Sequence, residues 1–163
     1  MIEHVTYLYR FNLGIAQRLV ADLTPGQMVL QPSGVVNHPA WTLGHLVISA
    51  NGLGRLLGLA PEVAEGWDRV FATGGIPSGD AADYPSKEEL LAALAAQHER
   101  NTEAVLQADP AWFAAPHPDE RRRRYFPTVG DVVIFLMTSH ETSHLGQVSA
   151  WRRAAGIGPP ARQ

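Results

Sequence analysis

Apolar residues recur along this chain mainly at steps of three and four positions, which is the period of an amphipathic helix. Four stretches show the pattern, at residues 2–23, 37–59, 86–107 and 128–155. The first is followed by Thr24-Pro25-Gly26 and the last by Gly156 and Pro159, which are residues that end helices. No stretch reads convincingly as a strand. The pattern therefore predicts an all-α protein with four long helices.

Three of these helices have recognisable starts. Ser86 and Glu89 have the spacing of a capping box, as do Thr128 and Asp131. The second helix is expected to begin at Asn37-His38-Pro39, because Asn can cap a helix and Pro is tolerated in the first turn. The fourth is expected to be one uninterrupted helix about 40 Å long, at roughly 1.5 Å per residue.

The longest stretch without a helical period is residues 61–85, which contains Gly74-Gly75 and Pro77-Ser78-Gly79. A connection of this length is usually a functional covering loop or a crossover between helices that are not neighbours. Glycines in the second helix, among them Gly44 and Gly54, favour a close crossing with another helix, the alternative being simply a weaker helix.

Composition narrows the class of protein. The 163 residues fit a single domain, 1–163, and the net charge of -3 does not point to a nucleic-acid surface. With no cysteine, any metal site must use His, Asp or Glu. The N-terminus lacks the features of a signal peptide, and no segment approaches the roughly 18 apolar residues that span a bilayer. A cytoplasmic protein is expected.

The most informative chemical motif is His140-Glu141-Thr142-Ser143-His144 in the fourth helix. Side chains four apart share a helix face, so His140 and His144 can bind one cation together. The same letters form the zincin signature, but no His, Asp, Glu or Cys follows His144 to supply a third ligand. A third ligand must come from upstream. His45, on the second helix, is expected to face the interior of the protein rather than water. The alternative is a pair of buried, hydrogen-bonded histidines.

Other polar residues near this motif have several interpretations. Glu141 is a weak catalytic candidate as a general base, with support of a metal ligand or simple surface exposure as alternatives. Gln147 lies one turn beyond His144 and is a weak candidate for binding a cofactor. His98 is either near the site or a hydrogen-bonded histidine at its boundary. The four arginines at 121–124 are either a solvated run paired with acidic neighbours or a positively charged rim for an anionic substrate.

Two motifs carry a resemblance to a known family. Trp41-Thr42-Leu43-Gly44-His45-Leu46 and the stretch from His140 to Leu145-Gly146-Gln147 resemble the DinB-like superfamily. The resemblance implies a four-helix bundle with a long crossover between helices two and three. It also implies a divalent metal held by His45, His140 and His144. Imidazole ligation suits zinc or nickel, and also iron.

Characterised relatives include bacillithiol transferases and mycothiol-dependent maleylpyruvate isomerase, which use the metal to activate a low-molecular-weight thiol. The expected function is therefore metal-dependent, thiol-dependent transfer to a small-molecule substrate that enters beneath residues 61–85. Arg152, or one of the arginines at 121–124, is a candidate for holding the thiol's carboxylates. The alternatives are a metal-dependent hydrolase and a non-catalytic module for small-ligand binding or dimerisation. A homodimer is an expected partner state, and nucleic acid and membrane are not expected partners.

Overall fold

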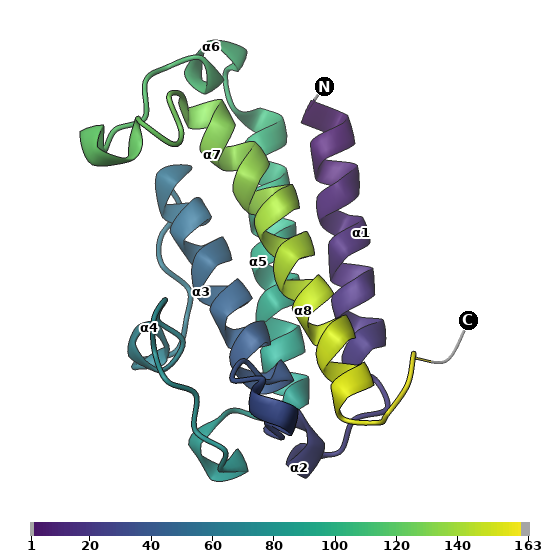
Figure 1. Cartoon of the computed structure of the whole chain (residues 1–163). Helices are drawn as coiled ribbons and strands as arrows, with labels where there is room; N and C mark the ends of the chain where they lie inside the picture. The colour runs from purple at the N-terminus through teal and green to yellow at the C-terminus, as the bar shows by residue number, and fades with distance from the viewer. Residues whose placement is uncertain (1, 161–163) are drawn as a thin grey trace.

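The computed structural model describes residues 2–160, which form helices joined by loops (Figure 1). Within this range there is no strand, and the β-type pairing is one isolated bridge between Pro116 and Thr128. The predicted all-α class is therefore confirmed. Four long elements lie lengthwise beside one another: α1 (Ile2–Val20), α3 (Pro39–Leu56), α5 (Lys87–Gln107), and α7 (Val129–Phe135) continued through η4 (Leu136–His140) into α8 (Glu141–Ala154).

Short helices occupy the connections between the long ones. They are α2 (Pro25–Met28), η1 (Pro32–Gly34), α4 (Trp67–Val70), η2 (Ala81–Asp83), α6 (Pro110–Phe113) and η3 (Glu120–Arg122). No helix among the described residues has the length and hydropathy needed to cross a membrane.

The long crossover joins α3 to α5 and carries α4 and η2 along the outside of the helices (Figure 1). It returns the chain to the end at which α3 began, so α3 and α5 run in the same direction. These two helices are direct neighbours, because the Asn101 side-chain amide donates a hydrogen bond of 2.8 Å to the Ala50 carbonyl. A Cβ on Gly54 would lie 3.1 Å from the Asn101 Oδ1. The crossover therefore does not link helices that are apart, which was one of its two predicted roles.

The predicted capping boxes at Ser86 and at Thr128 are both present. The start of α3 differs from the prediction, because His38 rather than Asn37 is its capping residue. His38 has an extended backbone, and its Nδ1 accepts a hydrogen bond of 3.2 Å from the Trp41 N–H. Its Nε2–H donates to the Ser78 carbonyl at 2.8 Å, so one imidazole caps α3 and ties it to the crossover.

The fourth long element contains an irregularity that the sequence analysis did not predict. Residues Leu136–His140 form a π-helical turn between α7 and α8. The buried side chain of Asn12 in α1 faces this turn, and its amide donates to the carbonyls of Met137 and Thr138, both at 3.4 Å. The turn ends at His140, the first residue of the histidine motif. Such turns are frequent at functional sites.

Candidate metal centre

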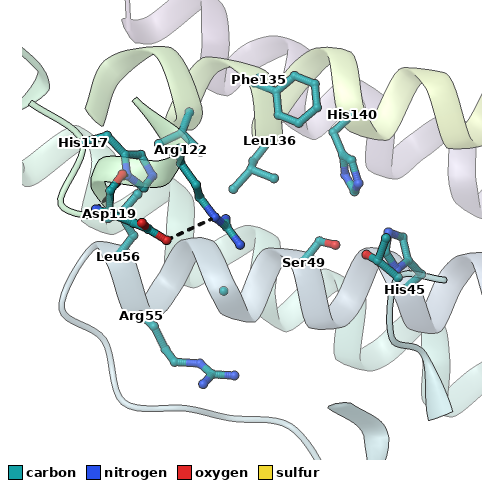
Figure 2. Close-up of a pocket in the computed structure, with 13 residues that line it drawn as sticks. His45, Ser49, Arg55, Leu56, His117, Asp119, Arg122, Phe135, Leu136 and His140 are labelled. Carbon is teal, nitrogen blue, oxygen red and sulfur yellow. Dashed lines mark hydrogen bonds and ion pairs between the residues drawn. The ribbon is translucent and has the colours of Figure 1, made fainter. Parts of the chain in front are cut away.

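A cavity of about 570 Å³ lies between α3 and the fourth long element. His45 and His140 line one end of it, while Arg55, His117 and Arg122 lie toward the other (Figure 2). The crossover contributes Thr73 to the lining, so most of the wall comes from the helices and from the segment before α7. Entry of a substrate beneath residues 61–85 stays a prediction, and Thr73 is the point at which that segment borders the cavity.

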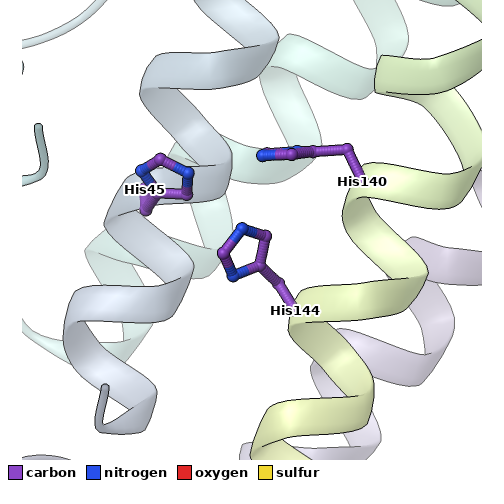
Figure 3. A group of neighbouring side chains, drawn as sticks. All are labelled: His45, His140 and His144. Carbon is purple, nitrogen blue, oxygen red and sulfur yellow. The ribbon is translucent and has the colours of Figure 1, made fainter. Parts of the chain in front are cut away.

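The three histidines named by the sequence motifs come together at that end of the cavity (Figure 3). His45 extends from α3, His140 from the end of η4 and His144 from the first turn of α8. Each offers one ring nitrogen, and these three atoms all lie within 4.8 Å of one another. His45 is buried and the other two are half-buried. The predicted interior orientation of His45 is confirmed.

The ring of His45 is fixed by contacts on two sides. Its Nδ1–H donates a hydrogen bond of 2.9 Å to the backbone carbonyl of Phe71, which leaves Nε2 free to bind a metal. The Trp41 ring stacks on the imidazole, with ring centres 4.9 Å apart and planes 7° from parallel. A backbone carbonyl on the second nitrogen is a common way to fix the tautomer and direction of a metal-binding histidine.

Phe71 reaches this position because residue 44 has no side chain. The Phe71 ring is completely buried and occupies the space that a Cβ on Gly44 would fill, at 2.2 to 2.3 Å from three ring carbons. The predicted close approach at Gly44 is therefore made by an aromatic ring of the crossover and not by another helix. Sequence reasoning missed Phe71, although an aromatic residue in a loop rich in Gly and Pro was a signal for an anchor.

The electrostatics of the other two histidines favour the form that binds metal. Burial lowers the pKa of His140 to about 4, and the neighbouring imidazoles of His144 and His45 add to the effect. Burial, with His45 beside it, also lowers the pKa of His144 to about 4. Both rings are thus neutral at pH 7, as ligation requires. Their Nδ1 atoms are buried without a hydrogen-bond partner.

These residues fit a divalent transition metal. Nitrogen ligands bind zinc at about 2.0–2.1 Å, so two tetrahedral ligands lie roughly 3.4 Å apart and modest side-chain movements would close the site. Three protein ligands leave a coordination position open, which is typical of catalytic rather than structural zinc sites. The histidine motif therefore forms a candidate metal centre that opens onto a cavity.

Glu141 lies outside this centre, and surface exposure, one of its three predicted roles, is wrong. Its side chain is buried, and Oε1 accepts a hydrogen bond of 2.8 Å from the Nε2–H of His98 in α5. The His98 ring stacks on Tyr9, with centroids 3.5 Å apart. Burial raises the pKa of Glu141, and the contact with His98 opposes that effect. His98 is thus a hydrogen-bonded histidine beside the site rather than a fourth ligand.

Arg152 cannot hold a substrate, which corrects its role as a candidate. The side chain is buried, and its guanidinium donates to both carboxylate oxygens of Asp22, at 2.7 and 2.8 Å, and to two backbone carbonyls. These contacts lower the pKa of Asp22 and fasten the C-terminal part of α8 to the end of α1.

Gln147 is exposed beyond His144, and its side-chain amide raises the pKa of that imidazole against the effect of burial.

Fold and site together define an all-α protein with a candidate three-histidine metal centre at one end of a cavity. The model of the DinB superfamily matches residues 9–148, and the chain belongs to that superfamily. A solved structure described as the conserved protein of locus from Enterococcus faecalis is similar, with a TM-score of 0.75 and 15% sequence identity. The likeness covers 94% of this chain and 96% of that one, and it shows a shared fold. No curated protein matches the chain.

Proposed function

We propose that the protein is a metal-dependent enzyme that transfers a low-molecular-weight thiol to an electrophilic small molecule. The observation that carries this proposal is the meeting of three imidazoles, those of His45, His140 and His144, at the end of a cavity large enough for a small molecule. A structural metal site has its coordination positions filled by protein ligands and does not need to open onto a cavity. The preference for a thiol rests on the resemblance to thiol-activating members of the superfamily.

The chain's own residues would hold the ion, orient its ligands and limit the access of water. A divalent ion held by the three histidines supplies a Lewis acid that favours the deprotonated form of a thiol or of water at neutral pH. The Phe71 carbonyl holds the Nδ1–H of His45, so Nε2 would be the nitrogen that binds the ion. Phe135 and Leu136 provide apolar wall beside His140, which limits competing water. Glu141 is engaged by His98 and is not available as a base.

The proposed reaction balances without an oxidant or reductant. The thiol gives up its proton to solvent, and its sulfur forms a bond to an electrophilic carbon of the second substrate. A leaving group on that carbon departs with the electron pair of the bond that breaks. Zinc or nickel is the proposed ion, with iron as an alternative, because ligands that are all imidazole suit these metals.

The first test is the metal itself. The purified protein should contain about one divalent transition metal per chain by elemental analysis. His45→Ala, His140→Ala and His144→Ala should each lose it, whereas His4→Ala removes an exposed histidine of α1 and should not. Full metal retention in His45→Ala would remove the ligand from α3 and with it the proposed centre.

The second test is turnover. Metal-loaded protein is assayed with electrophiles in the presence and absence of thiols, with His140→Ala as the inactive control. Turnover that requires both metal and thiol supports the transferase. Turnover that requires metal and ignores thiol would establish the hydrolase instead. Absence of turnover with every substrate class would leave a metal-binding module for small ligands.

A further inference from the structure

The four successive arginines before α7 have different surroundings, and two of them hold their own segment in place. Arg121 donates from its Nε and Nη2 to the Asp119 carboxylate, at 3.3 and 3.4 Å. The Arg123 Nε donates a 2.7 Å hydrogen bond to the His117 carbonyl, and its Nη1 lies 3.4 Å from a Glu120 carboxylate oxygen. The predicted pairing of this run with acidic neighbours is thus present for both residues.

Arg122 and Arg124 differ from that pair and from each other. Arg124 places its guanidinium over the ring of Tyr125, 4.6 Å from the ring centre. Arg122 lines the cavity, and Figure 2 shows its side chain extending into it from the segment before α7. The ion pair that Arg122 makes is with Asp119 at 3.9 Å, but that carboxylate already accepts hydrogen bonds from Arg121. Much of the positive charge of Arg122 is therefore left for another anion.

Two further groups lie at the same end of the cavity. His117 is buried, and its Nδ1 lies 3.0 Å from the Asp119 N–H and 3.2 Å from the Asp119 carbonyl, so Nε2 is the ring nitrogen left for a ligand. Arg55 comes from the last turn of α3. Its ion pair with Asp68 is long, at 3.6 Å, and joins two side chains that are more than half exposed, so it stabilises little.

The segment that presents His117 and Arg122 is held by backbone hydrogen bonds. The His117 N–H donates to the Pro127 carbonyl at 3.0 Å, and the Val129 N–H donates to the Ala115 carbonyl at 2.9 Å. Together with the Arg123 contact to the His117 carbonyl, these bonds close the loop at its base. Donors fixed in advance by the fold lose less freedom when a ligand binds.

We propose that Arg122, Arg55 and His117 form an anion subsite, which binds an anionic oxygen group of the substrate, either a carboxylate or a phosphate. Arginine suits both groups because its planar guanidinium can donate two parallel hydrogen bonds. The proposal deepens the proposed function and rests on the same cavity. A substrate would place its reacting atom at the histidines and its anionic group at the opposite end.

The anion subsite is tested without a metal, in full-length His45→Ala protein, so that the probe cannot bind to an ion at the histidines. Succinate and inorganic phosphate are titrated separately by calorimetry, and the tighter probe indicates which oxyanion the subsite prefers. Arg122→Gln should weaken binding roughly tenfold, as expected for loss of a charged hydrogen bond. Arg124→Gln makes the same charge change in the same segment and should bind as before. Binding of neither probe, or equal weakening by both substitutions, would overturn the proposal.

Kinetics separate this proposal from the proposed function. If metal-dependent turnover is found, Arg122→Gln should raise KM for an anionic substrate roughly tenfold while kcat changes little. A KM that matches the wild type would overturn the anion subsite and leave the enzyme activity intact. Anion binding that depends on Arg122 in a protein without turnover would support the subsite and count against the enzyme.

Discussion

Gly44→Ala tests whether the crossover sets the direction of His45. A methyl group at this position would lie 2.2 to 2.3 Å from three carbons of the Phe71 ring, far inside van der Waals contact. The ring is completely buried, so a shift of a few tenths of an ångström does not relieve the clash. Phe71 must therefore move out of its site, and its carbonyl moves away from the Nδ1 of His45.

The expected changes in stability and in zinc affinity follow from the displacement of the Phe71 ring and of its carbonyl. Removing a buried Phe side chain from a core costs about 3–5 kcal/mol, and Ala in a helix interior recovers about 1 kcal/mol relative to Gly. Gly44→Ala should therefore lower the free energy of unfolding by about 2–4 kcal/mol. Loss of a hydrogen bond that orients a metal ligand typically costs 10- to 100-fold in affinity, so zinc should bind weaker by roughly that factor.

Urea unfolding of metal-free protein measures the stability, and competition with a chromophoric chelator measures the zinc affinity. Gly146→Ala in α8 is the matched control, because a Cβ there would meet nothing within 4 Å beyond its own stretch of helix. It should be more stable than the wild type by up to about 1 kcal/mol and bind zinc equally well. A Gly44→Ala protein as stable as this control would refute the packing argument. Lower stability with unchanged zinc affinity would refute the role of the Phe71 carbonyl.

Three further predictions address the buried polar groups. Metal-free protein should lose stability as the pH falls from 6.5 to about 4, because burial holds the pKa of His140 and His144 at about 4 while the unfolded chain takes up these protons near 6.5. Urea unfolding at several pH values measures the slope, which a His140→Gln/His144→Gln protein should flatten. Arg152→Gln should lower the free energy of unfolding by about 2–3 kcal/mol with metal content unchanged, and metal loss in an otherwise folded protein would contradict its structural role. Asn12→Ala should cost about 1–3 kcal/mol in thermal or urea unfolding, since it removes the donor to two π-turn carbonyls, and a neutral effect would show that water replaces it.

The long helices could be predicted from sequence because their signals are local. The apolar period and the capping boxes at Ser86 and Thr128 each depend on residues a few positions apart, and both boxes are present. The pair His140 and His144 was equally local, since a spacing of four fixes a shared face. His45 could be added to this pair only from its own motif, Trp41 to Leu46, together with the family resemblance.

Contacts between segments that are far apart in the chain could not be predicted from the sequence. The Phe71 carbonyl meets His45 across 26 positions, and His98 meets Glu141 across 43. The helical period turns Glu141 to a different side of the helix from His140, but it cannot show that α5 covers that side with His98. For the same reason the sequence could not show that Arg152 is paired with Asp22, which lies in the loop after α1.

The π-helical turn explains how one element can serve both the core and the metal centre. Five of its buried residues follow one another at steps of four: Val129, Val133, Met137, Glu141 and Leu145. At 3.6 residues per turn each step of four overshoots a full turn by roughly 40°, so four steps in a regular helix would carry Leu145 about 160° away from Val129. A π turn takes up an extra residue and reverses much of this drift.

The direction of the histidines follows from the same turn. Because η4 ends at His140, the winding through it decides where His140 and His144 point relative to α7. A regular helix there would rotate α8 and turn its histidines away from His45 if α7 kept its place in the core. Asn12 in α1 donates to two carbonyls of this turn, which explains a buried amide on the apolar face of that helix. The run of four-residue steps was thus a sequence signal of the irregularity, and the polar Asn12 on the apolar face of α1 was a second one.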